Sequence, residues 1–109
     1  MRDAVDHLAR GGALLIFPEG YPNIDPNFTP KKNTADFLPF HAGFAAISAA
    51  AQRRLGTPIP TVPVGLSYAA QGRWRICIRF GAPMCAHDFA SRRSFVSAVQ
   101  NAVIELSKD

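Results

Sequence analysis

The sequence predicts an α/β domain in which a mixed, mostly parallel sheet is flanked by helices. The apolar run from Ala13 to Phe17 has the continuous pattern of a strand that is buried on both faces. A helical pattern from Ala42 to Leu55 follows this run and precedes a second apolar run, Ile59 to Tyr68. Because a helix that joins two strands of one sheet makes a right-handed crossover, we expect these two strands to be parallel.

The remaining elements extend the sheet and its cover. Asp3 to Arg10 has the pattern of a helix. Arg73 to Phe80 alternates between apolar and other residues, which predicts an antiparallel strand joined to the preceding strand by a hairpin turn. A last helical pattern covers Ser91 to Ser107. The prediction is one domain, residues 1–109, with about three strands and with helices packed on the sheet.

The chain is basic, with a formal net charge of +4 and a pI of about 9.6. This charge suits an anionic partner such as a phosphate ester, coenzyme A or an acidic lipid headgroup. Nucleic acid is not the expected partner, because Phe40, Trp74 and Phe80 are not interleaved with arginines as a base-stacking surface requires.

The two cysteines, Cys77 and Cys85, form no C-x-x-C pair, and we identify no histidine at a common metal-ligand spacing from them. We therefore expect buried free thiols in a reducing cytoplasm rather than a metal site or a disulfide. The sequence begins with no signal segment, and no apolar run reaches the roughly 18 residues that a membrane span needs. The expected location is the cytoplasm, with peripheral contact to the inner face of the membrane.

The first predicted strand runs into a carboxylate. Pro18 lacks an N–H and ends the strand, Glu19 follows it, and Gly20 allows close approach of backbone or substrate. Ligands of α/β folds bind at the carboxyl ends of parallel strands. The Glu19 carboxylate could orient a hydroxyl or a basic side chain or act as a general base, and the alternative is a turn carboxylate paired with an arginine.

The segment around Glu19, LLIFPEG, resembles the third conserved block of the glycerolipid acyltransferases, which include lysophosphatidic acid and glycerol-3-phosphate acyltransferases. The resemblance continues in order along nearly the whole chain. FLPFHAGFAAISAAA is similar to the segment and helix that follow that block, IPTVPVGLSY to the fourth block, and IRFGAPM to a later stretch before a closing helix. The resemblance implies an acyltransferase-like fold, of which this sequence is expected to be the incomplete, C-terminal part.

The resemblance also implies a reaction and a binding site. An acyl chain would pass from acyl-CoA or acyl carrier protein, as co-substrate, to a hydroxyl of a glycerol phosphate or lyso-lipid, with no bound cofactor or metal. Substrate binding is implied for Phe17, Pro18, Glu19 and Gly20, and Pro63 would shape the floor of the site.

The sequence departs from the family near these motifs. Tyr21-Pro22 stand where many members carry Thr-Arg or Ser-Arg, and the lysines of a PFKKG-like segment are missing from PFHAG. Lys31 and Lys32 are candidate replacement cations, or else a solvated charge pair. His41 is a candidate cation of the pocket, or else a residue at the entry to the helix.

The catalytic His-x-x-x-x-Asp motif of the family is absent from these 109 residues. The residues five places after the three histidines are Gly12 after His7, Ala46 after His41 and Arg92 after His87. We therefore expect this chain to lack acyltransferase activity by itself. The alternative is a non-catalytic module that binds an anion or a lipid headgroup.

Overall fold

The computed structural model describes residues 1–19, 39–71 and 73–108, with the backbone alone described at 68–71 and 73–74. The chain divides into two compact units, Met1–Thr57 and Pro58–Asp109. The candidate substrate residues near Glu19 belong to the first unit, and the β-hairpin belongs to the second.

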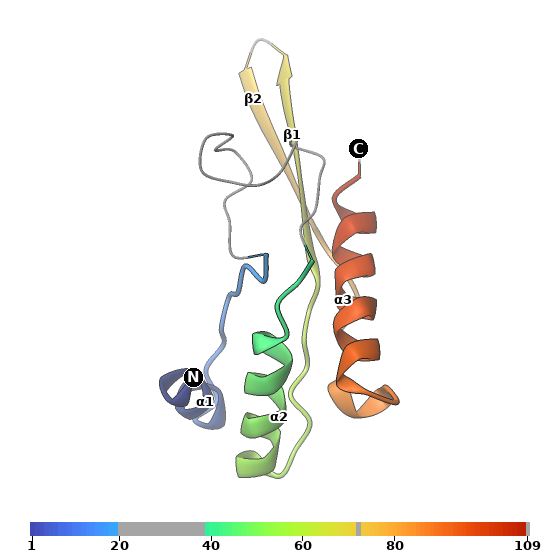
Figure 1. Ribbon diagram of the computed structural model, residues 1–109. Coiled ribbons are helices and arrows are strands. Elements are labelled where there is room, and N and C mark those ends of the chain that lie inside the picture. Colours follow the sequence, from blue (N-terminus) through green and yellow to red (C-terminus); the bar gives the residue numbers. More distant parts are fainter. Residues whose placement is uncertain (20–38, 72, 109) are drawn as a thin grey trace. The chain divides into compact units, whose positions relative to one another are not determined.

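The first unit contains two helices, α1 (Arg2–Ala9) and α2 (Gly43–Leu55), which pack against each other (Figure 1). α1 buries Val5, and α2 buries one stripe of small and aromatic residues: Phe44, Ala45, Ser48 and Ala51. The stripe recurs at helical spacing, and its small residues allow close helix contact. α2 ends at Gly56, whose φ of 78° is the left-handed conformation that glycine adopts without a steric penalty.

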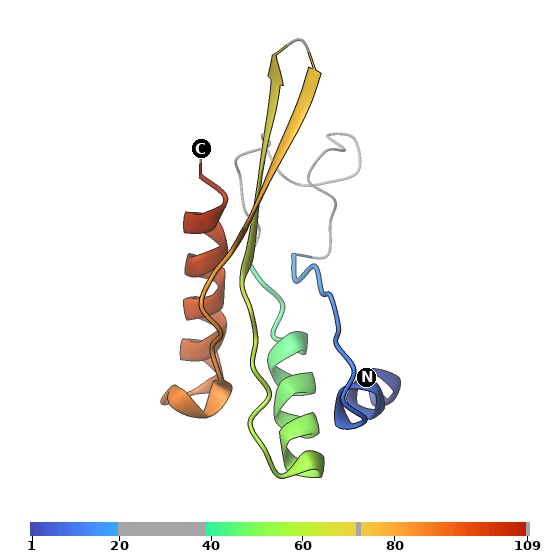
Figure 2. The ribbon, with the colours of Figure 1, turned by 180° about the vertical axis from the view of Figure 1, so that it is seen from behind.

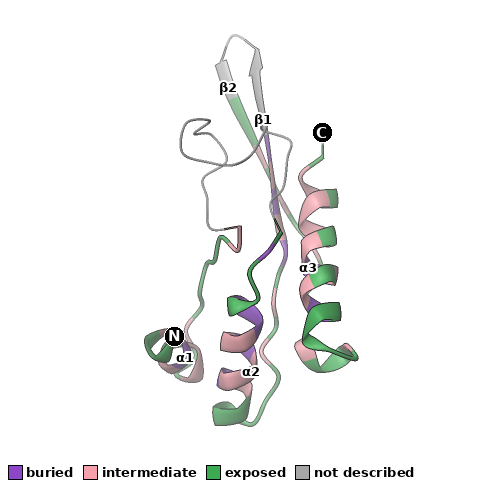
Figure 3. Cartoon of the chain, viewed as in Figure 1, coloured by how far each residue is buried: buried purple, intermediate pink, exposed green. Residues whose placement is uncertain are grey.

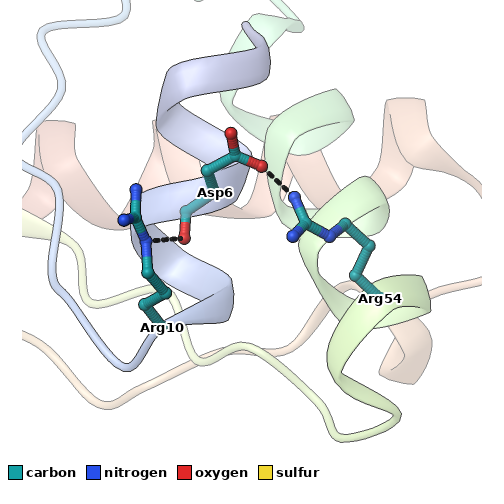
Figure 4. A network of polar contacts seen from close by, with 3 residues as sticks. All are labelled: Asp6, Arg10 and Arg54. Carbon is teal, nitrogen blue, oxygen red and sulfur yellow. Dashed lines mark hydrogen bonds and ion pairs between the residues drawn. The ribbon is translucent and has the colours of Figure 1, made fainter.

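A polar network joins the two helices on their solvent side (Figure 4). Arg54 of α2 forms an ion pair with the Asp6 carboxylate of α1, and Arg10 Nε donates to the main-chain oxygen of Asp6 at 3.2 Å. The ion pair is exposed to solvent, so its contribution to the free energy of folding is small, about 0–1 kcal/mol. The buried apolar stripe is therefore the main contact between α1 and α2.

The run Ala13–Phe17 is not the buried strand that its composition predicts. It has no strand pairing, and Phe17 is 69% exposed. A strand is stable only when its main-chain N–H and C=O groups find partners, and the described part of the first unit contains helices but no strand. The apolar composition of Ala13–Phe17 was therefore not sufficient for this segment to form a strand.

The second unit is built from a hairpin and a helix. β1 (Val64–Gln71) pairs with β2 (Arg73–Phe80) in antiparallel register, from Val64 opposite Phe80 to Gln71 opposite Arg73. The short 3₁₀ helix η1 (Ala86–Asp88) follows, and α3 (Arg92–Leu106) then lies beside β1 in both views (Figures 1 and 2).

The core of the second unit is centred on α3. Phe95 is fully buried and Val99 is 5% exposed. The ring of Phe89 lies with its centroid 5.5 Å from that of Phe95. α3 begins at a side-chain cap, because Ser91 Oγ accepts a hydrogen bond from Ser94 N–H at 3.1 Å. The Ser91 cap and the buried residues Phe95 and Val99 explain why this helix forms where the sequence predicts it.

Both buried and exposed residues occur along the strands of the hairpin (Figure 3), and its two faces differ in cover. Directly opposite residues share a face, so one face carries the apolar residues Val64, Leu66, Ile76, Ile78 and Phe80. On this face Ile78 is 55% and Phe80 is 72% exposed. The other face carries Gly65, Ser67, Cys77 and Arg79, and it meets α3 at Leu106.

The prediction of a mixed, mostly parallel sheet is wrong. The described residues form one two-stranded sheet, and its strands are antiparallel. The parallel pair depended on Ala13–Phe17 as its first strand, and that strand is absent from the structure. The second strand begins at Val64 rather than Ile59, after Pro60 and Pro63, which have no N–H to donate to a ladder. This strand also ends at Gln71 rather than Tyr68, whereas β2 has its predicted bounds and the three helices lie within one residue of theirs.

Candidate functional site

Two of the predicted substrate-binding segments lie side by side at the start of α2. The N–H of His41 donates to the main-chain oxygen of Pro18 at 2.9 Å. Pro18 and Glu19 form a turn and are half-buried, whereas His41 is exposed. The hydrogen bond therefore joins the FPEG and PFHAG motifs, which residues 21–38 separate in the sequence.

His41 stands between two buried aromatic residues. Phe40 and Phe44 are each 9% exposed and anchor the segment to the first unit. The His41 backbone is held by its hydrogen bond to Pro18. Its imidazole remains reachable from solvent at a fixed point of the chain.

The N-terminus of α2 beside His41 is suited to an anion. Its N-cap is Ala42, which has no polar side chain to satisfy the first N–H groups of the helix. A Cβ at Gly43 would meet no described atom within 4 Å, so the described residues leave room at the first residue of the helix. The N-terminus of a helix carries a partial positive charge, and a phosphate or carboxylate binds favourably there.

The other predicted site residues are distributed differently. Phe17 directly precedes the turn and is exposed, and Gly20, Lys31 and Lys32 lie outside the described residues. Pro63 is buried in the second unit, where its main-chain oxygen accepts a hydrogen bond from Gly81 N–H at 2.8 Å. The described residues thus bring together Pro18, Glu19 and His41.

A second cluster of possible ligand residues, which was not predicted from the sequence, lies in the second unit. Cys85, His87 and Asp88 place one potential ligand atom each within 4.8 Å of the other two. The sequence signal was three metal-ligand residue types in the run Cys85-Ala86-His87-Asp88. Cys77 and Cys85 are both free thiols and are half-buried rather than buried.

Comparison of the chain with family models, curated proteins and solved structures finds no match. The likeness to the glycerolipid acyltransferases therefore rests on the sequence motifs. Among the described helices, none has the length and apolar character needed to cross a membrane.

Proposed function

We propose that this chain is the acceptor-binding part of a glycerolipid acyltransferase. It holds a glycerol phosphate or lyso-lipid, whose free hydroxyl receives an acyl chain from an acyl-CoA or acyl carrier protein thioester. The observation that carries the proposal is the 2.9 Å hydrogen bond from His41 N–H to Pro18 O. It joins the two motifs that the resemblance assigns to one substrate pocket.

The groups near this hydrogen bond match the two ends of a glycerol phosphate. The uncapped N-terminus of α2 and the exposed His41 supply donors and positive potential for the phosphate. The half-buried Glu19 carboxylate supplies an acceptor for a glycerol hydroxyl. The net charge of +4 also favours an anionic ligand and an acidic membrane surface, where lyso-lipid acceptors lie.

In this proposal the chain binds the acceptor without transferring the acyl group by itself. A general base contributes about 10²–10⁴-fold to such a reaction. None of the three histidines of this sequence is followed by aspartate five places later. Purified chain mixed with acyl-CoA and a lyso-lipid should therefore release no coenzyme A above a buffer blank, and turnover would contradict this assignment.

A binding titration tests the acceptor site. We expect glycerol 3-phosphate to bind the full chain more tightly than inorganic phosphate, as measured by calorimetry or NMR. Glu19→Gln replaces the charged acceptor by a neutral one, which forms a weaker hydrogen bond, so it should weaken glycerol 3-phosphate binding about 10-fold and leave phosphate binding unchanged. Glu105→Gln, which changes an exposed carboxylate of α3, is the matched control.

The alternative is a module that binds an anion or lipid headgroup without recognising a hydroxyl. It is favoured by the uncapped N-terminus of α2, which serves any phosphate monoester. In that case glycerol 3-phosphate and inorganic phosphate bind equally, and Glu19→Gln changes neither affinity. Absence of binding by both ligands would contradict both functions.

A further inference from the structure

The turn between β2 and α3 is fixed at both ends. Before it, Thr61 and Met84 form an antiparallel bridge, with Thr61 N–H donating to Met84 O at 2.7 Å and Met84 N–H donating to Thr61 O at 2.8 Å. After it, Phe89 packs against the fully buried Phe95. The residues between these anchors therefore have a defined backbone position.

The 3₁₀ turn η1 sets the spacing of three side chains. Asp88 N–H donates to Cys85 O at 3.0 Å, which closes the turn. Residues i and i+3 of a 3₁₀ turn lie on the same side, so Cys85 and Asp88 share a side. His87 Nε2 lies 3.2 Å from Asp88 Oδ1, and the closest ligand atoms of all three residues lie within 4.8 Å of one another.

We propose that Cys85, His87 and Asp88 bind one divalent transition-metal ion of the zinc class. Thiolate, imidazole and carboxylate are the three ligand types of protein zinc sites, whereas calcium and magnesium prefer oxygen ligands alone. With metal–ligand distances of about 2.0–2.3 Å, two ligands of a tetrahedral ion lie roughly 3.3–3.7 Å apart. His87 and Asp88 are exposed at their side chains, so small rotations suffice to close the remaining distance.

The site has three protein ligands, which leaves a fourth position for water. The ion is reachable from solvent because two of the three ligands are exposed. Binding converts the Cys85 thiol to a thiolate and releases its proton to solvent. An ion held here links three residues of the turn that precedes α3 and binds only the folded turn, so it should raise the melting temperature of the second unit. This site is independent of the proposed acyl-acceptor function.

Cobalt titration of the reduced full chain tests the proposal. Co²⁺ should produce a thiolate-to-cobalt charge-transfer band that saturates at one ion per chain, and Zn²⁺ should displace it. Cys85→Ser should remove the band and weaken Zn²⁺ binding at least 10-fold, since even changes outside the ligand set cost about 10–100-fold. Cys77→Ser alters the other half-buried thiol and should keep the band, which makes it the matched control.

Two exposed-site variants make the test independent of any folding defect in Cys85→Ser. His87→Gln and Asp88→Asn should each weaken Zn²⁺ binding at least 10-fold while the circular dichroism spectrum stays unchanged. The proposal is overturned if the full chain shows no band or if His87→Gln binds as tightly as the unchanged chain. A saturation point of one ion per two chains would also overturn it, because the fourth ligand would then come from a second copy.

Discussion

The hairpin of the second unit has one face covered by a helix and one face exposed, and the covered face is the less apolar of the two. α3 lies against Gly65 and Arg79, whereas Ile78 and Phe80 are more than half exposed. Hydrophobicity alone would place the helix on the isoleucine face. Close approach and hydrogen bonding to the end of the helix therefore decide which face α3 covers.

The contacts on the covered face explain this choice. A Cβ on Gly65 would lie 2.4 Å from the carbonyl carbon of Leu106, so only glycine allows the strand and helix to meet this closely. Arg79 Nη1 donates to the main-chain oxygens of Leu106 at 3.1 Å and Lys108 at 2.8 Å. These carbonyls have no partner inside the helix, and a cation near them also complements the helix dipole.

The largest effect should come from filling the close approach. Gly65→Ala should lower the free energy of unfolding by about 3 kcal/mol, because α3 must shift to admit the methyl group. Urea unfolding measures this loss. Gly43→Ala makes the same chemical change where no described atom lies within 4 Å, and it should be neutral or stabilising by up to about 1 kcal/mol. Equal effects of the two variants would contradict the close packing of β1 and α3.

A smaller effect should follow from removing the hydrogen bonds to the helix end. Arg79→Met keeps the aliphatic part of the side chain but removes the donors to Leu106, Lys108 and Ser67. We expect a loss of about 1–2 kcal/mol, since the freed carbonyls are in part reached by water. Arg75→Met, at an exposed position of the same strand, should change stability by less than about 0.5 kcal/mol. Thermal melts of the two variants compare them directly.

The smallest effect on stability is expected on the exposed face. Ile78→Thr keeps a β-branched residue in β2 and should change the free energy of unfolding by no more than about 0.5 kcal/mol. It should also reduce self-association measured by light scattering, because it lowers the apolar character of an uncovered sheet face. A destabilisation above about 2 kcal/mol would mean that this face is buried in solution.

In the candidate site, too, features that depend on neighbouring residues could be predicted from the sequence, and contacts between distant residues could not. The resemblance to the acyltransferases identified Pro18, Glu19 and His41 as candidate site residues. It did not predict the hydrogen bond between His41 and Pro18. The short run from Cys85 to Asp88 could have been recognised from the sequence, because its geometry depends on one local 3₁₀ turn.

The sequence by itself determined the three helices and the hairpin. The signals that predicted them are local, because each involves residues that are close in the sequence. They are the helical spacing of apolar residues, the Ser91 cap, Gly56 at the end of α2, and the alternation along Arg73–Phe80. These signals hold wherever the element packs, because they arise from backbone geometry and from side chains that are near in sequence.

Only the tertiary structure decided burial and pairing. Ala13–Phe17 and the apolar face of β2 have the composition of buried strands, yet Phe17 and Phe80 are mostly exposed. Arginine side chains are usually solvated, yet Arg79 is half-buried against the end of α3. Burial depends on which surface a distant part of the chain offers, and main-chain groups pair only where a partner is within reach. Neither condition is contained in the local sequence, and in the second unit the close approach of α3 to Gly65 decided which face of the hairpin is covered.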